Sequence, residues 1–348
     1  MSRFFSRSFD QLEAYVPGEQ PRDMKYVKLN TNESPFPPTE KVKEAAAQAA
    51  GNVNRYNDPE CTVLRQKAAE LYGVGVNNVV CVNGSDEALY LAFWAYRDET
   101  FAFPDITYGF YKVFCDSLGL EKKIIPLNEN YEIDKNDYMN IGCNIVIANP
   151  NAQTGVALPK SDIEEIIRSN PDNIVIVDEA YIDFGGDSCV DLIDKYENLI
   201  VTQTFSKSRC LAGARIGFAI GCEALMADLN TLRYSMNPYN VNTITQMAAA
   251  AAIDDNDIYM AQCREIMEVR EYTVEGLDEL GFKTLPSSSN FIFTTCEGKD
   301  GTKIYLDLKE RGVLVRHFDS PRMKEYIRVT IGSRAQMEVF LETLKGVL

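Results

Sequence analysis

Residues 199–207, with the sequence LIVTQTFSK, form a run of strand-forming residues that leads directly to Lys207. Isoleucine, valine and threonine suit the pleated surface of a sheet, so we expect a strand over residues 199–204. The amine of Lys207 then lies just past a rigid element. A lysine amine is mostly protonated at its ordinary pKa of about 10.4, so it reacts only where neighbours desolvate it or a carbonyl captures it. Taken alone, Lys207 would be a solvated surface lysine.

Three other motifs change that interpretation. Asp178-Glu179-Ala180-Tyr181 and Gly84-Ser85-Asp86-Glu87 each follow an apolar run, and Arg215 comes eight positions after Lys207. Each motif stands at an expected strand end, before a loop or helix. Pyridoxal phosphate requires two groups: a lysine that can form a Schiff base, and an acidic residue that pairs with the pyridinium nitrogen. Together the motifs describe a site for that cofactor.

These motifs resemble those of the fold-type I aminotransferases (class II) and, within them, of the histidinol-phosphate aminotransferases. The matching stretches run from Tyr15-Val16-Pro17-Gly18 to Arg328-Val329-Thr330-Ile331-Gly332, nearly the whole chain. The resemblance implies an α/β fold, with a large domain whose mainly parallel sheet is sandwiched by helices and a small α+β domain. It also implies a homodimer with shared active sites.

The implied reaction moves an amino group between histidinol phosphate or imidazole acetol phosphate and glutamate or 2-oxoglutarate, in histidine biosynthesis. Two other enzymes stay open, because they share the cofactor motifs: an aromatic-amino-acid aminotransferase and a threonine-phosphate decarboxylase-like lyase. A non-enzymatic sensor or binding module would tolerate loss of Lys207 or carry an added DNA-binding domain. Neither is seen in the sequence.

Composition bounds the class of protein. A chain of 348 residues fits one large domain and a smaller one, and 45% hydrophobic with 25% charged residues is typical of a soluble globular protein. No segment approaches the roughly 20 apolar residues of a membrane span. The N-terminal residues lack the pattern of a secretory signal, so we expect a cytoplasmic enzyme without membrane partners.

Charge and cysteine usage exclude two further classes. A formal charge of −16 argues against nucleic acid, whose phosphates need clustered basic residues. Nine cysteines without a Cys-x-x-Cys pair, and a single histidine, argue against a metal site and favour reduced, mostly buried thiols. If the substrates are anions, local arginines must override the global field within a screening length of about 8 Å.

The order of expected elements gives three parts: an N-terminal arm (residues 1–30), a large cofactor-binding domain (31–240) and a small C-terminal domain (241–348). The large domain alternates helices and strands, which predicts a mainly parallel sheet with ligands at the carboxyl ends of its strands. We expect its strands at residues 79–82, 100–103, 123–126, 144–148, 173–177 and 199–204. We expect its helices at residues 39–50, 62–72, 85–94, 108–118 and 161–168.

Beyond residue 240 an alanine-rich helix and a long amphipathic helix lead to a smaller α+β lobe. These two helices are expected at residues 243–253 and 257–280. The later elements are expected as strands 290–294, 313–316 and 326–331, with helices 303–311 and 336–344.

The resemblance assigns the cofactor contacts residue by residue. Lys207 would anchor the cofactor and act as general base, Asp178 would hold the ring nitrogen, and Tyr181 would contact the ring hydroxyl; these three are the expected catalytic residues. The phosphate would be bound at the helix N-terminus and by a serine and an arginine, an aromatic residue would stack on the ring, and a tyrosine would reach across from the other subunit. These residues are Ser85, Asp86, Ser206, Arg215, Tyr108 and Tyr56.

One motif departs from the resembled family. Where the family shows two asparagines and a proline before Thr-Gly, this chain has Asn151-Ala152-Gln153-Thr154-Gly155. Ala152 therefore takes the place of the asparagine that contacts the ring hydroxyl. Either Asn151 serves in its stead, or Tyr181 makes that contact alone.

Four residues are candidates for binding the substrate. Arg328 opens the small-lobe motif and, by resemblance, would grip the substrate's carboxylate or phosphate, because a guanidinium recognises both anions. Arg316 ends the preceding strand, so pairing of the two strands would bring both arginines to the cleft. Tyr15 and Asn32 are further candidates for the same pocket.

Overall fold

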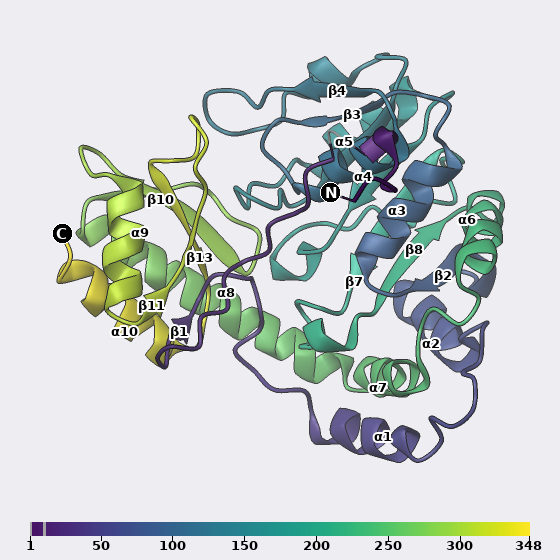
Figure 1. The fold of residues 1–348 in the computed structure, drawn as a ribbon, viewed down its shortest axis with the longest axis horizontal. Coiled ribbons are helices and arrows are strands. Elements are labelled where there is room, and N and C mark those ends of the chain that lie inside the picture. Colours follow the sequence, from purple (N-terminus) through teal and green to yellow (C-terminus); the bar gives the residue numbers. More distant parts are fainter. Residues whose placement is uncertain (1, 10–11) are drawn as a thin grey trace.

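The protein is described by a computed structural model that covers residues 2–9 and 12–348. Residues 1, 10 and 11 of the expected arm lie outside the described residues. A large lobe built on one sheet and a smaller lobe lie side by side, and the long helix α8 (Asn256–Glu279) connects them (Figure 1). The division at residues 30 and 240 stays a prediction.

The large lobe contains a seven-stranded sheet in the order β2-β8-β7-β6-β5-β3-β4. The strands are β2 (Val79–Val82), β3 (Phe101–Pro104), β4 (Lys122–Ile125), β5 (Asn144–Ala148), β6 (Val175–Asp178), β7 (Leu199–Thr204) and β8 (Gly217–Gly221). Only β8 runs antiparallel to its neighbours. The prediction of an α/β fold with a mainly parallel sheet is confirmed.

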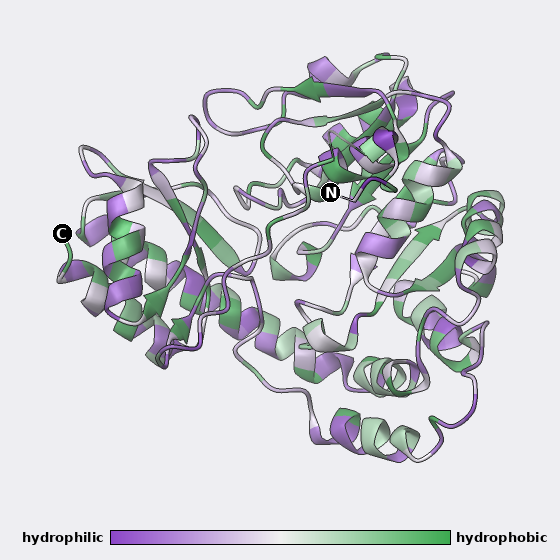
Figure 2. Cartoon of the chain, viewed as in Figure 1, coloured by the Kyte–Doolittle hydropathy of each residue, from purple (hydrophilic) through white to green (hydrophobic). Residues whose placement is uncertain are grey.

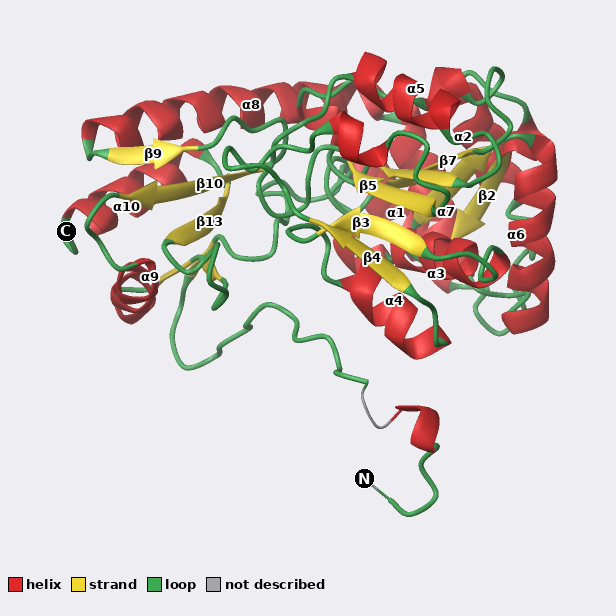
Figure 3. Cartoon of the chain, turned by 90° about the horizontal axis from the view of Figure 1, so that it is seen from above, coloured by secondary structure: helices red, strands yellow, loops and turns green. Residues whose placement is uncertain are grey.

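Both faces of this sheet are buried, because successive side chains of a strand point to opposite sides. On one face Ile176 and Ile200 pack with α3 (Ser85–Ala95), α4 (Phe110–Leu118) and α6 (Glu223–Met236). On the other, Val177 and Val201 pack with four helices, namely α1 (Glu40–Ala50), α2 (Thr62–Tyr72), α5 (Lys160–Ser169) and α7 (Thr243–Asp254). Most of the central strands are accordingly rich in apolar residues (Figure 2), whereas the edge strand β4 begins with Lys122 and Lys123. Helices lie above and below the sheet (Figure 3).

The small lobe holds a four-stranded antiparallel sheet in the order β12-β13-β10-β9. Its strands are β9 (Phe282–Thr284), β10 (Phe291–Cys296), β12 (Arg316–His317) and β13 (Tyr326–Thr330), with helices α9 (Gly301–Glu310) and α10 (Arg334–Lys345). A separate parallel pair joins β1 (Val27–Lys28) to β11 (Val313–Leu314). The end of the N-terminal arm is thus bound to the small lobe.

The structure corrects several expected elements. Strand 313–316 is wrong as a single element, because its first two residues pair with β1 and Arg316 pairs with β13 in another sheet. The helix expected from residue 108 begins at Phe110, which leaves Tyr108 in the preceding loop. Strands β1, β8 and β9 and helix α6 were not expected; the other helices and strands begin and end within two residues of their expected bounds.

Two findings concern the molecule as a whole. Within the described ranges, no helix is long and apolar enough to cross a membrane. All nine cysteines are free thiols, and six of them are buried.

Candidate active site

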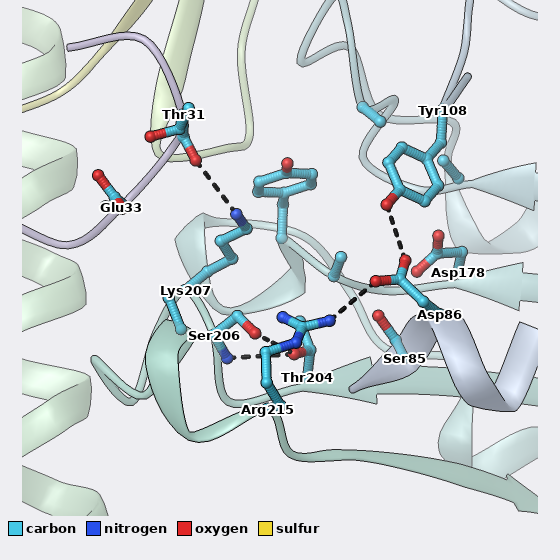
Figure 4. A pocket seen from close by; sticks show the side chains of 15 residues that line it. Thr31, Glu33, Ser85, Asp86, Tyr108, Asp178, Thr204, Ser206, Lys207 and Arg215 are labelled. Carbon is cyan, nitrogen blue, oxygen red and sulfur yellow. Dashed lines mark hydrogen bonds and ion pairs between the residues drawn. The ribbon is translucent and has the colours of Figure 1, made fainter. Parts of the chain in front are cut away.

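A pocket opens where strands β5, β6 and β7 end, next to the segment that follows β1 (Figure 4). It brings together eight of the residues expected to bind the cofactor: Ser85, Asp86, Tyr108, Asp178, Tyr181, Ser206, Lys207 and Arg215. Residues far apart in the sequence therefore meet at the carboxyl edge of a parallel sheet, where ligands of such folds gather.

Lys207 is held just beyond the last residue of β7. The Thr204 hydroxyl accepts a hydrogen bond from the backbone N–H of Ser206 (3.1 Å) and donates to the Ser206 hydroxyl (2.8 Å), which fixes the turn that follows the strand. The Lys207 amine lies 3.4 Å from the carbonyl oxygen of Thr31 and 5.8 Å from the ring centre of Tyr181. It forms no ion pair with any carboxylate in the described part of the chain, so its charge is open to a ligand.

Asp178 closes the inner end of the pocket. Its carboxylate is buried and accepts hydrogen bonds from the Tyr111 hydroxyl (2.8 Å) and the Thr202 hydroxyl (3.2 Å). Burial raises the pKa of Asp178 to about 6, although these hydrogen bonds act in the opposite direction. Two donors thus fix the direction of a carboxylate that would gain from a nearby positive charge.

The N-terminus of helix α3, beside Asp178, provides a position for an anion (Figure 4). Ser85 and Asp86 lie in the first turn of α3, where backbone N–H groups lack helical partners and the helix dipole is positive. Arg215, in a left-handed conformation (φ 55°), bonds the Asp86 carboxylate at 2.8 Å. Residue 84 has a φ of 82°, a conformation that favours glycine, and a Cβ there would lie 2.5 Å from the present position of the Arg215 guanidinium. The missing side chain leaves room for the arginine beside the helix end.

Tyr108 stands over the same space. Its hydroxyl donates to the Asp86 carboxylate at 2.7 Å, and its ring packs 5.7 Å from that of Tyr111. Burial, followed by the charge of Asp86, raises the pKa of Tyr108, so the phenol stays neutral. The ring is therefore fixed by a hydrogen bond at its tip.

A second pocket continues from the first towards the small lobe. It shares Lys207 and Tyr181 with the first pocket, and it contains the four expected substrate residues: Tyr15, Asn32, Arg316 and Arg328. Arg316 and Arg328 are register partners in the β12–β13 pair. Tyr15 lies against the ring of Phe110, at 4.4 Å between centres.

Arg328 is half-buried and has no acidic partner among the described residues. One terminal nitrogen donates to the Ala152 carbonyl oxygen and to the Gln153 side-chain oxygen, both at 3.0 Å, while its Nε has no hydrogen-bond partner. Burial and the neighbouring Arg316 lower the pKa of Arg328. A half-buried guanidinium whose Nε lacks a hydrogen-bond partner is a suitable position for an anionic group of a ligand.

Two expected cofactor residues lie elsewhere. The Asn151 amide oxygen accepts from the backbone N–H groups of Gln153 and Thr154, and its nitrogen donates to the Ile106 carbonyl oxygen. Asn151 therefore shapes its own loop and does not line the pocket, whereas Ala152 does. Tyr56 is 82% exposed and stacks on Tyr239, so its contact with a partner subunit stays a prediction.

Sequence reasoning missed five residues that contact this site: Thr31, Glu33, Tyr111, Thr202 and Thr204. Two of them carried a signal. Thr202 and Thr204 alternate along β7 and so face the side of the sheet on which Asp178 lies. Tyr111 is three positions beyond Tyr108, but its contact with Asp178 depends on how α4 packs.

Comparison with known proteins agrees with this geometry. Residues 24–344 match the family model for aminotransferase class I and II. Histidinol-phosphate aminotransferases of Marinomonas sp. (strain MWYL1) and Brachyspira hyodysenteriae are each 46% identical to this chain, over 99% and 100% of it and 99% of each relative.

Solved structures show the same fold. A putative histidinol-phosphate aminotransferase from Erwinia carotovora atroseptica superposes with a TM-score of 0.85 at 27% identity, covering 92% of this chain and 95% of the other. The Sinorhizobium meliloti histidinol-phosphate aminotransferase, solved with pyridoxal-5'-phosphate, superposes with a TM-score of 0.90 at 23% identity, over 100% and 99%. Given the full-length relatives and the matched family model, the chain belongs to the class I and II aminotransferases and, within them, to the histidinol-phosphate aminotransferase family.

Proposed function

We propose that this enzyme uses pyridoxal phosphate to exchange an amino group between histidinol phosphate and 2-oxoglutarate, giving imidazole acetol phosphate and glutamate. The observation that carries the proposal is the charge pattern of the two joined pockets. Lys207, Arg316 and Arg328 bond only backbone and amide oxygens in the described chain. The two arginines, which have no carboxylate partner in the described part of a protein of charge −16, favour small anionic substrates.

The residues of the inner pocket fit pyridoxal phosphate. The helix end at Ser85, with Ser206 and Arg215, would hold its phosphate, and the missing side chain at Gly84 lets the Arg215 guanidinium lie beside that helix end. Asp178 would hold its ring nitrogen, and Tyr108 would cover the ring. When bound, the cofactor withdraws electrons from the substrate Cα, which makes the Cα proton acidic.

The chain's own groups would then move and hold protons. Lys207 stands at the junction of the pockets, so its amine can take a proton from the substrate Cα and return it at the neighbouring carbon of the cofactor. Asp178, fixed by Tyr111 and Thr202, would keep a proton on the ring nitrogen. Contact with that cation would favour the ionised carboxylate and offset the effect of burial.

Arg328 and Arg316 would bind the far end of the substrate. Arg328 has a free Nε and would grip the carboxylate of glutamate or the phosphate of histidinol phosphate. Arg316 is half-buried and lies across from it, so a second guanidinium is available to a group of higher charge. A phosphate dianion would gain more from two arginines than a single carboxylate would.

The proposal includes a cytoplasmic homodimer in which Tyr56 reaches the partner's cofactor phosphate. The exposed Tyr56–Tyr239 pair, with Val53, Met236 and Met247 also exposed, supports an interface there. Size measurement in solution, together with the cofactor affinity of Tyr56→Phe, tests it. A fully active monomer, or unchanged affinity in the variant, would contradict it.

The decisive assay supplies several amino donors with 2-oxoglutarate and records glutamate formation and CO₂ release in parallel. We expect histidinol phosphate to give the highest kcat/KM, with no CO₂. CO₂ release from threonine phosphate would favour the lyase. A higher kcat/KM for phenylalanine would move the assignment to the aromatic aminotransferases.

A further inference from the structure

The hydroxyl of Tyr181 has a partner that the known motifs do not suggest. Asn32 donates a hydrogen bond from its Nδ2 to the Tyr181 oxygen at 2.9 Å, and both side chains are buried. Tyr181 belongs to the large lobe, whereas Asn32 lies in the segment after β1, 149 positions away. Both residues line the substrate end of the pocket.

Asn32 is itself held in place by the small lobe. Thr330, at the end of β13, accepts a hydrogen bond from the Asn32 backbone N–H (2.9 Å) and donates one to the Asn32 side-chain oxygen (3.1 Å). Asn290 donates to the Asn32 carbonyl oxygen at 3.0 Å. Asn32 also has a positive φ of 55°, which non-glycine residues adopt at a cost and often at functional positions.

These bonds determine which end of the Asn32 amide meets Tyr181. Because the amide oxygen accepts from Thr330, the amide nitrogen faces the tyrosine. A phenol has one proton to donate, and Asn32 supplies a donor. The proton of Tyr181 must therefore point away from Asn32, and the pocket lies beside it.

Because residue 152 is alanine, the Tyr181 hydroxyl gains importance as a hydrogen-bond donor in this part of the pocket. It lines the pocket beside Tyr181 and has no polar side chain, and the neighbouring Asn151 is engaged by its own loop. A ligand oxygen near Tyr181 would then depend on this one phenol. The orientation of the phenol becomes the feature that Asn32 controls.

We propose that Asn32 is a positioning residue that fixes the Tyr181 hydroxyl as a hydrogen-bond donor to the ring oxygen of the bound cofactor, with Thr330 setting the direction of the Asn32 amide. This inference rests on the proposed cofactor. In this role Asn32 does not itself touch the substrate, because it acts on the cofactor through the Tyr181 hydroxyl. It also links the position of the small lobe to the charge on the cofactor ring.

The test is the pH titration of the cofactor's visible absorption, with no substrate present. A hydrogen bond donated to the ring oxygen favours its negatively charged form, so it lowers the pKa of the bound cofactor. Asn32→Ala should raise that pKa by about 0.5–1 pH unit, the shift expected from one weakened hydrogen bond. Thr330→Val, which keeps the side-chain shape, should raise it in the same direction by less.

A double variant separates positioning from a structural role. In Tyr181→Phe the pKa should already be raised, and adding Asn32→Ala should change it no further, because the two residues act through one hydroxyl. The matched control is Asn290→Ala. This change removes the hydrogen bond to the Asn32 backbone carbonyl but leaves the bonds of the Asn32 side-chain amide. The pKa of the bound cofactor should then stay near that of the wild type.

The outcomes distinguish failure of the proposed function from failure of the positioning role of Asn32. A wild-type protein that binds no pyridoxal phosphate and shows no visible band would overturn the proposed function. A normal band with an unchanged pKa in both Asn32→Ala and Thr330→Val would overturn the positioning role alone. A shift that persists when Asn32→Ala is added to Tyr181→Phe would assign Asn32 a separate role and would also overturn the inference.

Discussion

Asp178 and Glu179 are consecutive carboxylates at the end of β6, and they have opposite surroundings. Both are buried, and burial raises the pKa of Asp178 to about 6 and of Glu179 to about 7. Asp178 faces the pocket, where Thr202 donates to it. Glu179 faces the other side of the sheet, where Gln203 donates to it at 2.8 Å, Ser188 at 2.7 Å and the Cys189 backbone N–H at 2.6 Å.

The contrast extends to the basic residues. Arg209 lies behind the site, buried and paired with the carboxylate of Asp183. Lys207, two positions earlier, faces the pocket and has no such partner in the described structure. Arg209 behind the sheet is thus neutralised within the protein, and at the pocket Arg215 is paired with Asp86, whereas Lys207 is left for a ligand. Burial alone therefore does not distinguish a charged residue of the site from a structural one; between Lys207 and Arg209, the presence or absence of a charged partner does.

Replacing Lys207 should have the largest effect. Lys207→Ala removes the proposed proton carrier, so kcat should fall by about 10²–10⁴-fold while the melting temperature stays near that of the wild type. Lys283→Ala is the matched control, because Lys283 is an exposed lysine. Wild-type turnover by Lys207→Ala would remove the residue from its role.

Asp178→Asn should rank second. The amide keeps the shape but loses the charge that would hold a proton on the cofactor ring, so we expect kcat to drop by about 10²–10³-fold, as for other lost electrostatic contacts. Cofactor binding should persist, as visible absorbance would show. Comparison with Glu179→Gln sharpens the contrast, since that neighbouring change should leave kcat within about threefold. Similar losses in both variants would contradict the distinction between the two faces.

The two unpaired arginines should show smaller effects that depend on the substrate. A lost charged hydrogen bond costs about 1.5–3 kcal/mol in kcat/KM. We expect Arg328→Ala to lower kcat/KM for both histidinol phosphate and glutamate, and Arg316→Ala to affect the phosphorylated substrate more. Arg334→Ala, at an exposed ion pair with Glu338, is the control. Equal, small effects of Arg316→Ala on both substrates would place phosphate recognition elsewhere.

Glu179→Gln should have the smallest effect on activity and change the pH dependence of stability. Because the folded-state pKa of Glu179 is raised above its ordinary value of 4.5, the folded protein binds the proton more tightly than the unfolded chain. The resulting stability is full below about pH 4.5 and is lost as pH rises towards 7.

Denaturant unfolding at pH 5 and pH 8 would measure this effect. The unfolding free energy of the wild type, relative to Glu179→Gln, should fall by roughly 2–3 kcal/mol between the two pH values. A difference between the two proteins that does not change with pH would show that Glu179 is ionised at its ordinary pKa.

Much of this site could be predicted because it follows strand ends. Lys207, Asp178 and Ser85 each lie at the end of a strand or within three residues of it, and the rule for parallel sheets brings such positions together. The alternation of side chains along β6 also separates Asp178 from Glu179, although the sequence alone does not show which one faces the pocket.

Other features depend on contacts that no local pattern carries. Strand β8 was not predicted because it begins and ends in glycine, a residue typical of turns. The glycine at its start is required by close packing, since a Cβ at Gly217 would lie 2.5 Å from the Ser85 backbone nitrogen. Asn32 and Thr330 are 298 positions apart, and their bond forms only when the lobes pack. Asn151 looked like a ligand residue because its bonds to its own loop cannot be seen in the motif.

The most direct test of the account is to find which residue holds the cofactor. After borohydride reduction of the cofactor-loaded enzyme and digestion with trypsin, mass spectrometry of the peptides would locate the attached group. We predict that the mass lies on the peptide of residues 196–209, uncut after Lys207 because that lysine is modified. Attachment at any other lysine, or no retained mass, would contradict the assignment of this pocket.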